Sequence, residues 1–464
     1  MEFRTTDRVA LFELYVYAQN LPPENTFDNF RKLCFNGVPD KMRPMVWKIL
    51  MNHLPFDERG NWESIQTNFR TNYYGLICQF LRNPKEEEII VLKSKDVGST
   101  TSKWKSLFHD AELMEQIDKD VRRTFPDMAF FQLPVKASSI CPLYAPYNVL
   151  LMEKRHCIGK WLRCFNSDSE VGGRKRQNSI PMGSVEILEY HWEVMLRILY
   201  IYCKVNAGIG YVQGMNNLIA PIYFVLANDS DENNRAHAEA DTFFIFNSIM
   251  CEIKDLFTRS LDEIGLHSEP NSHENVNKMP VDMSSFGYLI PEQAKTRGIG
   301  DTMERLMKQL QKYDFELWDD LVTVKQLDGL FFAFRWISVM FTQEFSLPDC
   351  LRIWDSIFAE VFATPCLTPA SLQQVFTARP ESGVLDFLIQ FSCAMLLSVK
   401  QELLAGDFSE NMQLLQHYPL DVEIVFEKVR ELRIPEKTFI SEAKELLEMI
   451  PFKLNAPKDG YKWV

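Results

Sequence analysis

Apolar residues recur every three or four positions along most of this chain, which is the period of an amphipathic α-helix. The clearest segments of this kind span residues 8–20, 27–35, 42–54, 62–80, 110–125, 241–257, 301–312, 315–321, 331–337, 351–358 and 385–398, with shorter ones up to residue 447. No alternating apolar–polar stretch of useful length and no fixed-period repeat is present. The pattern therefore predicts an all-α fold.

The stretch of residues 206–218 lies between two strongly apolar helical segments. Ser184 is expected to cap the first helix, and the glycines at 208 and 210 are expected to stop it, because glycine tolerates positive φ. The second helix is expected to start at Met215 and to be interrupted at Pro221. Between them a tight loop places one polar side chain, Gln213, between Val212 and Gly214. This residue is either a presented catalytic group or an amide that caps the loop.

The segment 110–125 is predicted to be a helix that starts at Asp110 and closes before Pro126. Its apolar stripe consists of Leu113, Met114, Ile117 and Val121. Arg122 and Arg123 fall outside this stripe, near the helix C-terminus, where the helix dipole favours cations.

Each of these two arginines has a carboxylate within reach on the helix surface. Asp118 lies four residues before Arg122, and Asp120 lies three residues before Arg123. Periodicity does not choose between the two arginines. Both also fit a solvated pair that compensates the helix dipole.

Four polar segments are predicted to be loops: residues 86–101, 165–183, 229–237 and 261–300. The second contains the basic run Arg174-Lys175-Arg176 shortly before Ser179, and we interpret it as a surface insertion. Its Arg-x-x-Ser pattern suits a basophilic kinase but is too short to be specific.

Composition excludes several function classes. The 464 residues suggest two or three folding units, and 46% hydrophobic residues suffice for a large core. The net charge of −13 argues against a nucleic-acid surface and against general attraction to anionic lipid. No apolar run reaches the roughly 20 residues of a membrane span, and the N-terminus has no signal-peptide or myristoylation pattern. These features predict a cytoplasmic protein.

Signatures of self-contained chemistry are absent from the sequence. The ten cysteines include no Cys-x-x-Cys pair, and the eight histidines show no ligand spacing. We therefore expect no metal site, and we expect the cysteines to be free thiols. There is no phosphate-binding Gly-x-x-x-x-Gly-Lys-Ser/Thr loop, no His-Glu-x-x-His and no Gly-x-Ser-x-Gly. We expect no cofactor of the protein's own.

Two short motifs are Ile-x-x-Asp-x-x-Arg at residues 117–123 and Tyr-x-Gln-Gly at residues 211–214. Together with further segments in order along the chain, they resemble the motifs of TBC domains, which are GTPase-activating proteins for Rab small GTPases. Upstream, residues 43–47 resemble the opening Arg-x-x-x-Trp element; downstream, residues 334–336 and 351–355 resemble a later helix pair, and residues 414–419 a segment that often follows it.

This resemblance implies a fold of two helical subdomains that form a V-shaped groove for the Rab. It also implies that Arg123 is an arginine finger and that Gln213 replaces the Rab's own switch glutamine. Asp120 would orient Arg123, Tyr211 would buttress the loop, and Gly214 would allow close approach to the Rab. Because of the insertion around residue 174, the two fingers are farther apart in sequence than in compact members of the family.

The remaining motif residues are interpreted as structural: Arg43, Trp47, Trp336 and Trp354. We assign residues 1–32 to an N-terminal helical extension, 33–362 to the TBC domain and 363–464 to a C-terminal extension packed on it. The expected partner is a Rab in its GTP state, with the Rab's own Mg²⁺. Membrane contact would occur only through the Rab, transiently at endomembranes, in the regulation of vesicle trafficking.

Two other functions compete with GTPase activation. A TBC fold can dock a Rab or a scaffold without catalysis, and such modules usually lose the arginine or the glutamine. A helical scaffold with no GTPase partner would leave the paired motifs unexplained. Both finger residues are present here, which favours the activating role.

Overall fold

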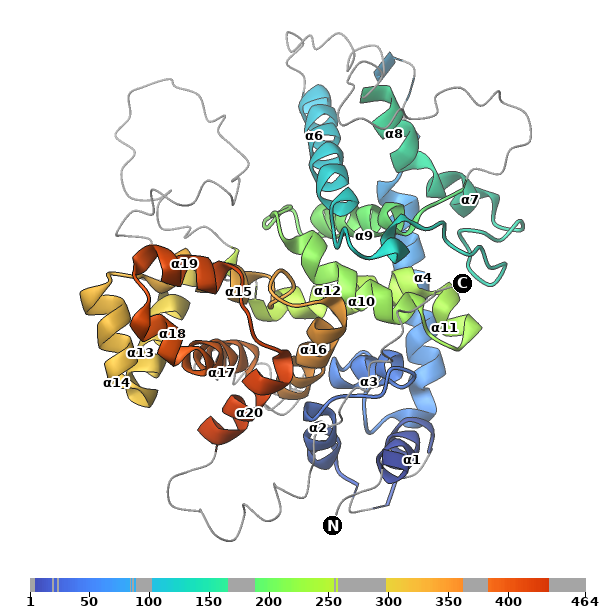
Figure 1. Ribbon diagram of the computed structural model, residues 1–464. Helices are drawn as coiled ribbons and strands as arrows, with labels where there is room; N and C mark the ends of the chain where they lie inside the picture. Colours follow the sequence, from blue (N-terminus) through green and yellow to red (C-terminus); the bar gives the residue numbers. More distant parts are fainter. Residues whose placement is uncertain are drawn as a thin grey trace, which may run out of the picture. The chain divides into compact units, whose positions relative to one another are not determined.

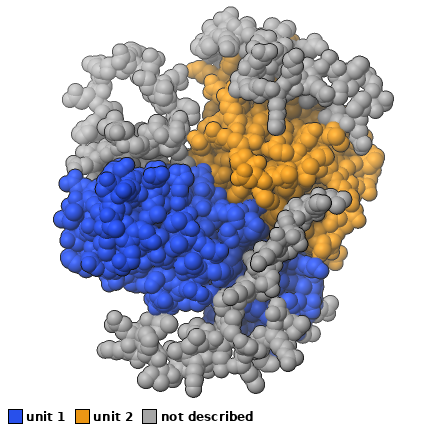
Figure 2. Space-filling model, viewed as in Figure 1, with its two compact units in different colours: residues 1–60, 300–464 blue, residues 61–299 orange. Residues whose placement is uncertain are grey.

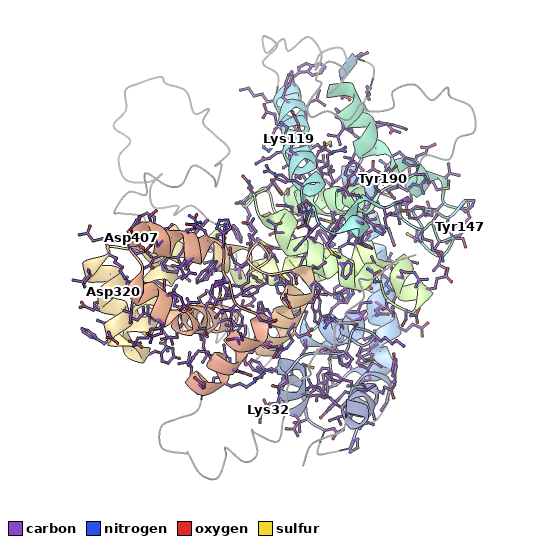
Figure 3. The ribbon with its side chains drawn as sticks, viewed as in Figure 1. Lys32, Lys119, Tyr147, Tyr190, Asp320 and Asp407 are labelled. Atoms are coloured by element: carbon purple, nitrogen blue, oxygen red, sulfur yellow. The ribbon has the colours of Figure 1, made fainter. Side chains whose placement is uncertain are left out.

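The computed structural model describes residues 5–18, 21–22, 25–83, 85, 87–88, 102–165, 188–253, 256–257, 298–361 and 383–433. These residues form helices and contain no strand; the one β-bridge joins Pro134 and Tyr190 (Figure 1). The chain divides into two compact units, which Figure 2 shows in different colours. Unit 1 combines Met1–Gly60 with Gly300–Val464, and unit 2 is the continuous segment Asn61–Ile299.

Unit 2 is built around three strongly apolar helices. Its helices are α4 (Trp62–Phe80), α6 (Ser102–Arg122), α7 (Val149–Arg155), α8 (Cys157–Phe165), α9 (His191–Val205), α10 (Met215–Ala227), α11 (Glu232–Ala236) and α12 (Ala238–Ile253). Helices α9, α10 and α12 pack against one another, α6 packs on α9, and α4 packs on α12. Most side chains of the central three are buried because apolar residues occupy nearly every face. This core gives the candidate site a rigid base.

Unit 1 joins three N-terminal helices to the C-terminal half of the chain. Its helices are α1 (Thr5–Tyr17), α2 (Phe27–Phe35), α3 (Arg43–Leu50), α13 (Ile299–Tyr313, whose first residue belongs to unit 2), α14 (Phe315–Asp319), α15 (Ala333–Ser338), α16 (Leu347–Val361), α17 (Gly383–Ser398), α18 (Lys400–Ala405), α19 (Phe408–Gln416) and α20 (Val422–Arg433). Helix α16 packs on α2, α3 and α17, and α17 packs on α20.

A buried carboxylate ties α16 to the N-terminal segment. Asp355 accepts hydrogen bonds from the Val38 amide at 2.8 Å, Arg43 Nε at 3.0 Å and Trp47 Nε1 at 2.7 Å. Burial opposes the charge on Arg43, but Asp355 and Asp40 outweigh it and raise the pKa of the guanidinium above its ordinary value. This geometry fits the interpretation of Arg43 as a structural partner.

The three tryptophans of the predicted motif elements belong to the core of unit 1. Trp47, Trp336 and Trp354 are fully buried. The rings of Trp47 and Trp354 lie 6.2 Å apart, and Trp354 Nε1 donates to the Met340 carbonyl at 3.0 Å. These residues act through packing.

Most predicted helices are confirmed, and two match to the residue: α2 and α4. The largest errors in the predicted boundaries are two helix starts. Helix α6 begins at Ser102, so Asp110 is inside it and pairs with Lys204 at 2.8 Å instead of capping. Helix α9 begins at His191; Leu188, predicted to be helical, precedes it and is exposed.

Two expected interruptions are also wrong. Helix α10 continues through Pro221, because a single lost donor is outweighed by the burial of nearly every neighbouring side chain. The predicted polar loop at 229–237 contains the short helix α11, which Asp231 caps through its side chain.

Several predicted features lie outside the described residues: Ser184, most of the loop at 86–101, the insertion at 166–183 with its basic run, and most of the segment 261–300. The domain boundaries at 32 and 362 remain predictions.

Candidate functional site

The C-terminus of α6 presents two arginines in different ways. Arg122 Nε pairs with Asp118 Oδ1 at 2.9 Å, and its guanidinium lies 3.8 Å from the centre of the Trp192 ring on α9. Arg123 is the first residue after the helix; its side chain is 63% exposed, and its Nη2 pairs with Asp120 Oδ1 at 2.6 Å. The structure thus separates two neighbours that the sequence could not: both are exposed, but Arg122 stacks on Trp192 and is 39% exposed, whereas Arg123 is 63% exposed.

Asp120 connects this arginine to the loop that precedes α10. Its second oxygen, Oδ2, accepts a hydrogen bond from the Tyr211 hydroxyl at 2.8 Å. Burial and the Asp120 carboxylate raise the pKa of Tyr211 well above its ordinary value, so the hydroxyl remains a donor. The side chain of Asp120 is buried, whereas that of Arg123 is exposed. One buried carboxylate therefore orients the arginine and anchors the loop.

The loop itself depends on two glycines with positive φ. Helix α9 ends at Val205, and its cap Asn206 bonds back to the Tyr202 carbonyl. The turn therefore begins before Gly208, which has no positive φ. Gly210 has φ +68° and Gly214 has φ +106°, a region that other residues rarely adopt. Gly214 is the N-cap of α10, so it sets the direction in which the loop enters that helix.

Gln213 is half-buried at the end of this loop, and its carboxamide makes no hydrogen bond to any other described residue. The amide that caps the loop is a different one. Asn216 Oδ1 accepts from the Gly214 amide at 3.2 Å and lies 3.4 Å from the Tyr211 hydroxyl. The capping role considered for Gln213 is therefore filled by Asn216.

Sequence reasoning missed two residues of this site, Thr124 and Asn216. Asn216 Nδ2 donates to Thr124 Oγ1 at 2.9 Å, and the Thr124 hydroxyl donates to the Asp120 carbonyl at 2.9 Å. Both residues are buried. Thr124 directly follows Arg123, and Asn216 lies two residues after Gly214. An Asn in the first turn of a helix nevertheless reads as ordinary in sequence, because its partners lie far away along the chain.

A second cluster of charges in unit 2 is closed and structural. Arg197 is buried between Glu189 and Glu239, with Nη1–Oε1 and Nε–Oε1 distances of 2.5 and 2.6 Å. Its Nη1 also donates to the Arg155 carbonyl at 3.0 Å, and Tyr73 donates to Glu239 at 2.8 Å. These groups hydrogen-bond one another, and Arg197, Glu189 and Glu239 are all buried, which fits a structural role. Within the described ranges, no group of three or more His, Cys, Asp or Glu residues could hold a metal ion.

Comparison with known proteins identifies the family. Residues 186–272 and 292–404 match the family model of the Rab-GTPase-TBC domain. The chain is 33% identical over 439 residues to TBC1 domain family member 13 of Homo sapiens, and the alignment covers 89% of this chain and 95% of that protein. The chain belongs to the Rab-GTPase-TBC domain family.

Other matches agree with this TBC assignment. The Mus musculus TBC1 domain family member 13 is 34% identical over 443 residues, with 89% of this chain and 95% of that protein covered. The crystal structure of the Ypt/Rab-GAP domain of Gyp1p has a TM-score of 0.54 at 17% identity, covering 93% of this chain and 98% of that one. At that identity it supports the fold alone, and it confirms the predicted TBC-type all-α class.

Membership in the TBC family supports a general role as a Rab GTPase-activating protein. The family-model match includes the Gln213 loop and begins after Arg123, so the assignment of Arg123 depends on its motif and its geometry. Among the residues that the structure describes, no helix is long and apolar enough to cross a membrane.

Proposed function

We propose that this chain accelerates GTP hydrolysis by a Rab-family GTPase by supplying Arg123 and Gln213 to the Rab's nucleotide site. A small GTPase hydrolyses GTP slowly when charge on the phosphate oxygens is poorly stabilised and the attacking water is poorly positioned. The two side chains address these two needs separately. The Rab would be in its GTP state and would bring its own Mg²⁺.

Arg123 would stabilise the charge that develops on the transferred phosphate. A guanidinium is planar, permanently charged and able to donate several hydrogen bonds at once. Its exposure leaves it able to reach a partner, and Asp120 limits the directions in which it points. An arginine finger contributes roughly 10³–10⁵ in rate.

Gln213 would position the attacking water in place of the Rab's switch glutamine. A carboxamide can accept from water and donate to phosphate at the same time. No described residue occupies either end of this carboxamide. Gly214, with no side chain, would let the loop come close to the Rab.

The observation that carries the proposal is that the side chain of Asp120 contacts residues of both motifs. Its Oδ1 pairs with Arg123, and its Oδ2 accepts from Tyr211, two residues before Gln213. Residues far apart in sequence are thereby held at one place on unit 2. That juxtaposition is what a two-finger mechanism requires.

The test is a panel of purified Rabs loaded with GTP and assayed for phosphate release with and without the full-length chain. We expect strong acceleration of one or a few Rabs, and loss of that acceleration in Arg123→Ala and Gln213→Ala. If no Rab is accelerated but some bind in the GTP state, the alternative role as a Rab-binding or scaffold module replaces this one. On the proposed function the protein regulates vesicle trafficking from the cytoplasm and reaches endomembranes through the Rab.

A further inference from the structure

We propose that Asn216 is a positioning residue that holds the turn bearing Arg123 and the loop bearing Gln213 in one fixed geometry. This inference rests on the proposed function and adds a residue to it. Asn216 is in the first turn of α10 and is 5% exposed, so it is too buried to be a third finger.

The carboxamide of Asn216 uses both of its ends. On one side Nδ2 donates to Thr124 Oγ1 at 2.9 Å and lies 3.4 Å from the Asp120 carbonyl oxygen. On the other side Oδ1 accepts from the Gly214 amide at 3.2 Å. No other natural side chain of this size offers two donors and an acceptor in one plane.

The first set of bonds lies at the C-terminal end of α6. Thr124 directly follows Arg123, and its hydroxyl returns to the Asp120 carbonyl at 2.9 Å. Asn216 thus holds the residues on both sides of Arg123. Without these bonds the turn after α6 would depend on weaker local contacts, and the arginine would sample more directions.

The second bond fixes the backbone next to Gln213. The Gly214 amide is part of the peptide bond between Gln213 and Gly214, so its hydrogen bond to Asn216 restricts the orientation of that peptide bond. Gly214 has a positive φ, and glycine can also adopt many other backbone conformations. A hydrogen bond from a neighbouring side chain therefore helps to keep Gly214 in this one. Asn216 supplies that partner.

A positioning role predicts a loss in turnover without a matching loss in binding. We expect Asn216→Ala to lower the kcat of stimulated hydrolysis by about 10²-fold, since a displacement near 1 Å costs that much. The KM for the Rab should change by less than about threefold, since surface contacts are untouched. The matched control is Asn217→Ala, the next residue on α10, which should behave like the wild type.

Two further variants guard against simple misfolding. Asn216→Asp keeps the size and the acceptor but loses both donors, and Thr124→Val keeps the shape of Thr124 but loses its hydroxyl. Both should lower kcat while Tm falls by less than about 5 °C. Wild-type turnover in either Asn216 variant would overturn the proposal. The proposal would also be overturned if the Asn216 variants lost kcat only when the whole protein was destabilised and Thr124→Val remained fully active.

Hydrogen exchange followed by mass spectrometry gives a readout that needs no Rab. In Asn216→Ala, exchange should rise in peptides covering residues 118–125 and 208–216 and stay unchanged in α12. If the wild-type chain accelerates no Rab, the proposed function fails, and the hydrogen-exchange measurement alone tests the positioning role of Asn216. Unchanged exchange in the two peptides would then overturn the positioning role, whereas a local rise would support it.

Discussion

Tyr211 donates a 2.8 Å hydrogen bond to Asp120 Oδ2, and this contact joins the two motifs of the TBC domain. The same carboxylate pairs with Arg123 through its other oxygen. Orientation of the arginine and anchoring of the loop therefore depend on one buried group.

We expect Arg123→Ala to reduce the stimulated rate by roughly 10³–10⁵. Arg123→Lys should not restore it, because lysine keeps the charge but loses the planar fork. Arg122→Ala removes a stacking contact on Trp192, worth about 0.5–1 kcal/mol, and should alter the rate little. Phosphate release from a responsive Rab measures all three. Equal losses for the two neighbouring arginines would contradict the assignment.

If Gln213 positions the water, a Rab with alanine in place of its switch glutamine should be nearly inert alone and still be strongly accelerated by this chain. Gln213→Ala should lose acceleration on both forms of the Rab, because Asn216 is engaged in the core and cannot substitute. Single-turnover hydrolysis with the four combinations gives the answer. A harmless Gln213→Ala, together with no acceleration of the altered Rab, would leave an arginine-only mechanism.

Asp355→Ala should destabilise unit 1 by about 3–5 kcal/mol, because it leaves the buried Arg43 guanidinium without its main partner. The exposed Asp28, which pairs with Lys32 at 2.9 Å, provides the control, and Asp28→Ala should cost at most about 0.5 kcal/mol. Urea unfolding followed by circular dichroism measures both. Similar costs for the two would mean that the buried network contributes no more than a surface pair.

Stability should fall in mild acid, in part through His191. Burial, which Glu189 only partly offsets, lowers the pKa of this imidazole from 6.5 to about 4. The unfolded chain therefore binds the extra proton between these values, so stability is complete above pH 6.5 and declines as the pH falls towards 4.

The variant His191→Gln keeps a polar partner for the Tyr223 hydroxyl, which lies 2.7 Å from His191 Nδ1. Between pH 7 and 4.5 the wild type should lose about 2 kcal/mol more unfolding free energy than this variant. His156 and Glu193 also have shifted pKa values, about 4 and about 7, but they are unchanged in both proteins and cancel. Identical pH dependence would show that His191 does not contribute.

The sequence predicted local features of the fold well where a segment carries its own boundaries. Helix α2 is capped by the Thr26 side chain, and α4 has a regular apolar stripe. It failed where tertiary contacts decide: Asp110 has the chemistry of a cap, yet Lys204 of α9 engages it inside a longer helix.

In the candidate site, too, local contacts were predictable from the sequence and long-range contacts were not. Asp120 and Arg123 are three residues apart, so helical geometry anticipates their pairing. The bonds of Asn216 to Thr124 cross a long stretch of chain, and no local pattern encodes them. The motif thus predicts which residues are presented, and only the three-dimensional structure reveals what holds them.

Unit 2 is inserted in the sequence of unit 1, so the two parts of unit 1 are synthesised at different times. Arg43 and Trp47 emerge early, whereas Asp355, which both need, is synthesised only after all of unit 2. Domains generally fold as units during synthesis, so unit 2 can form its core first. Until Asp355 is synthesised, the N-terminal helices have exposed aromatic rings, and Arg43 lacks this buried partner. Newly made chains interrupted before residue 355 should therefore be the species that depends most on chaperones.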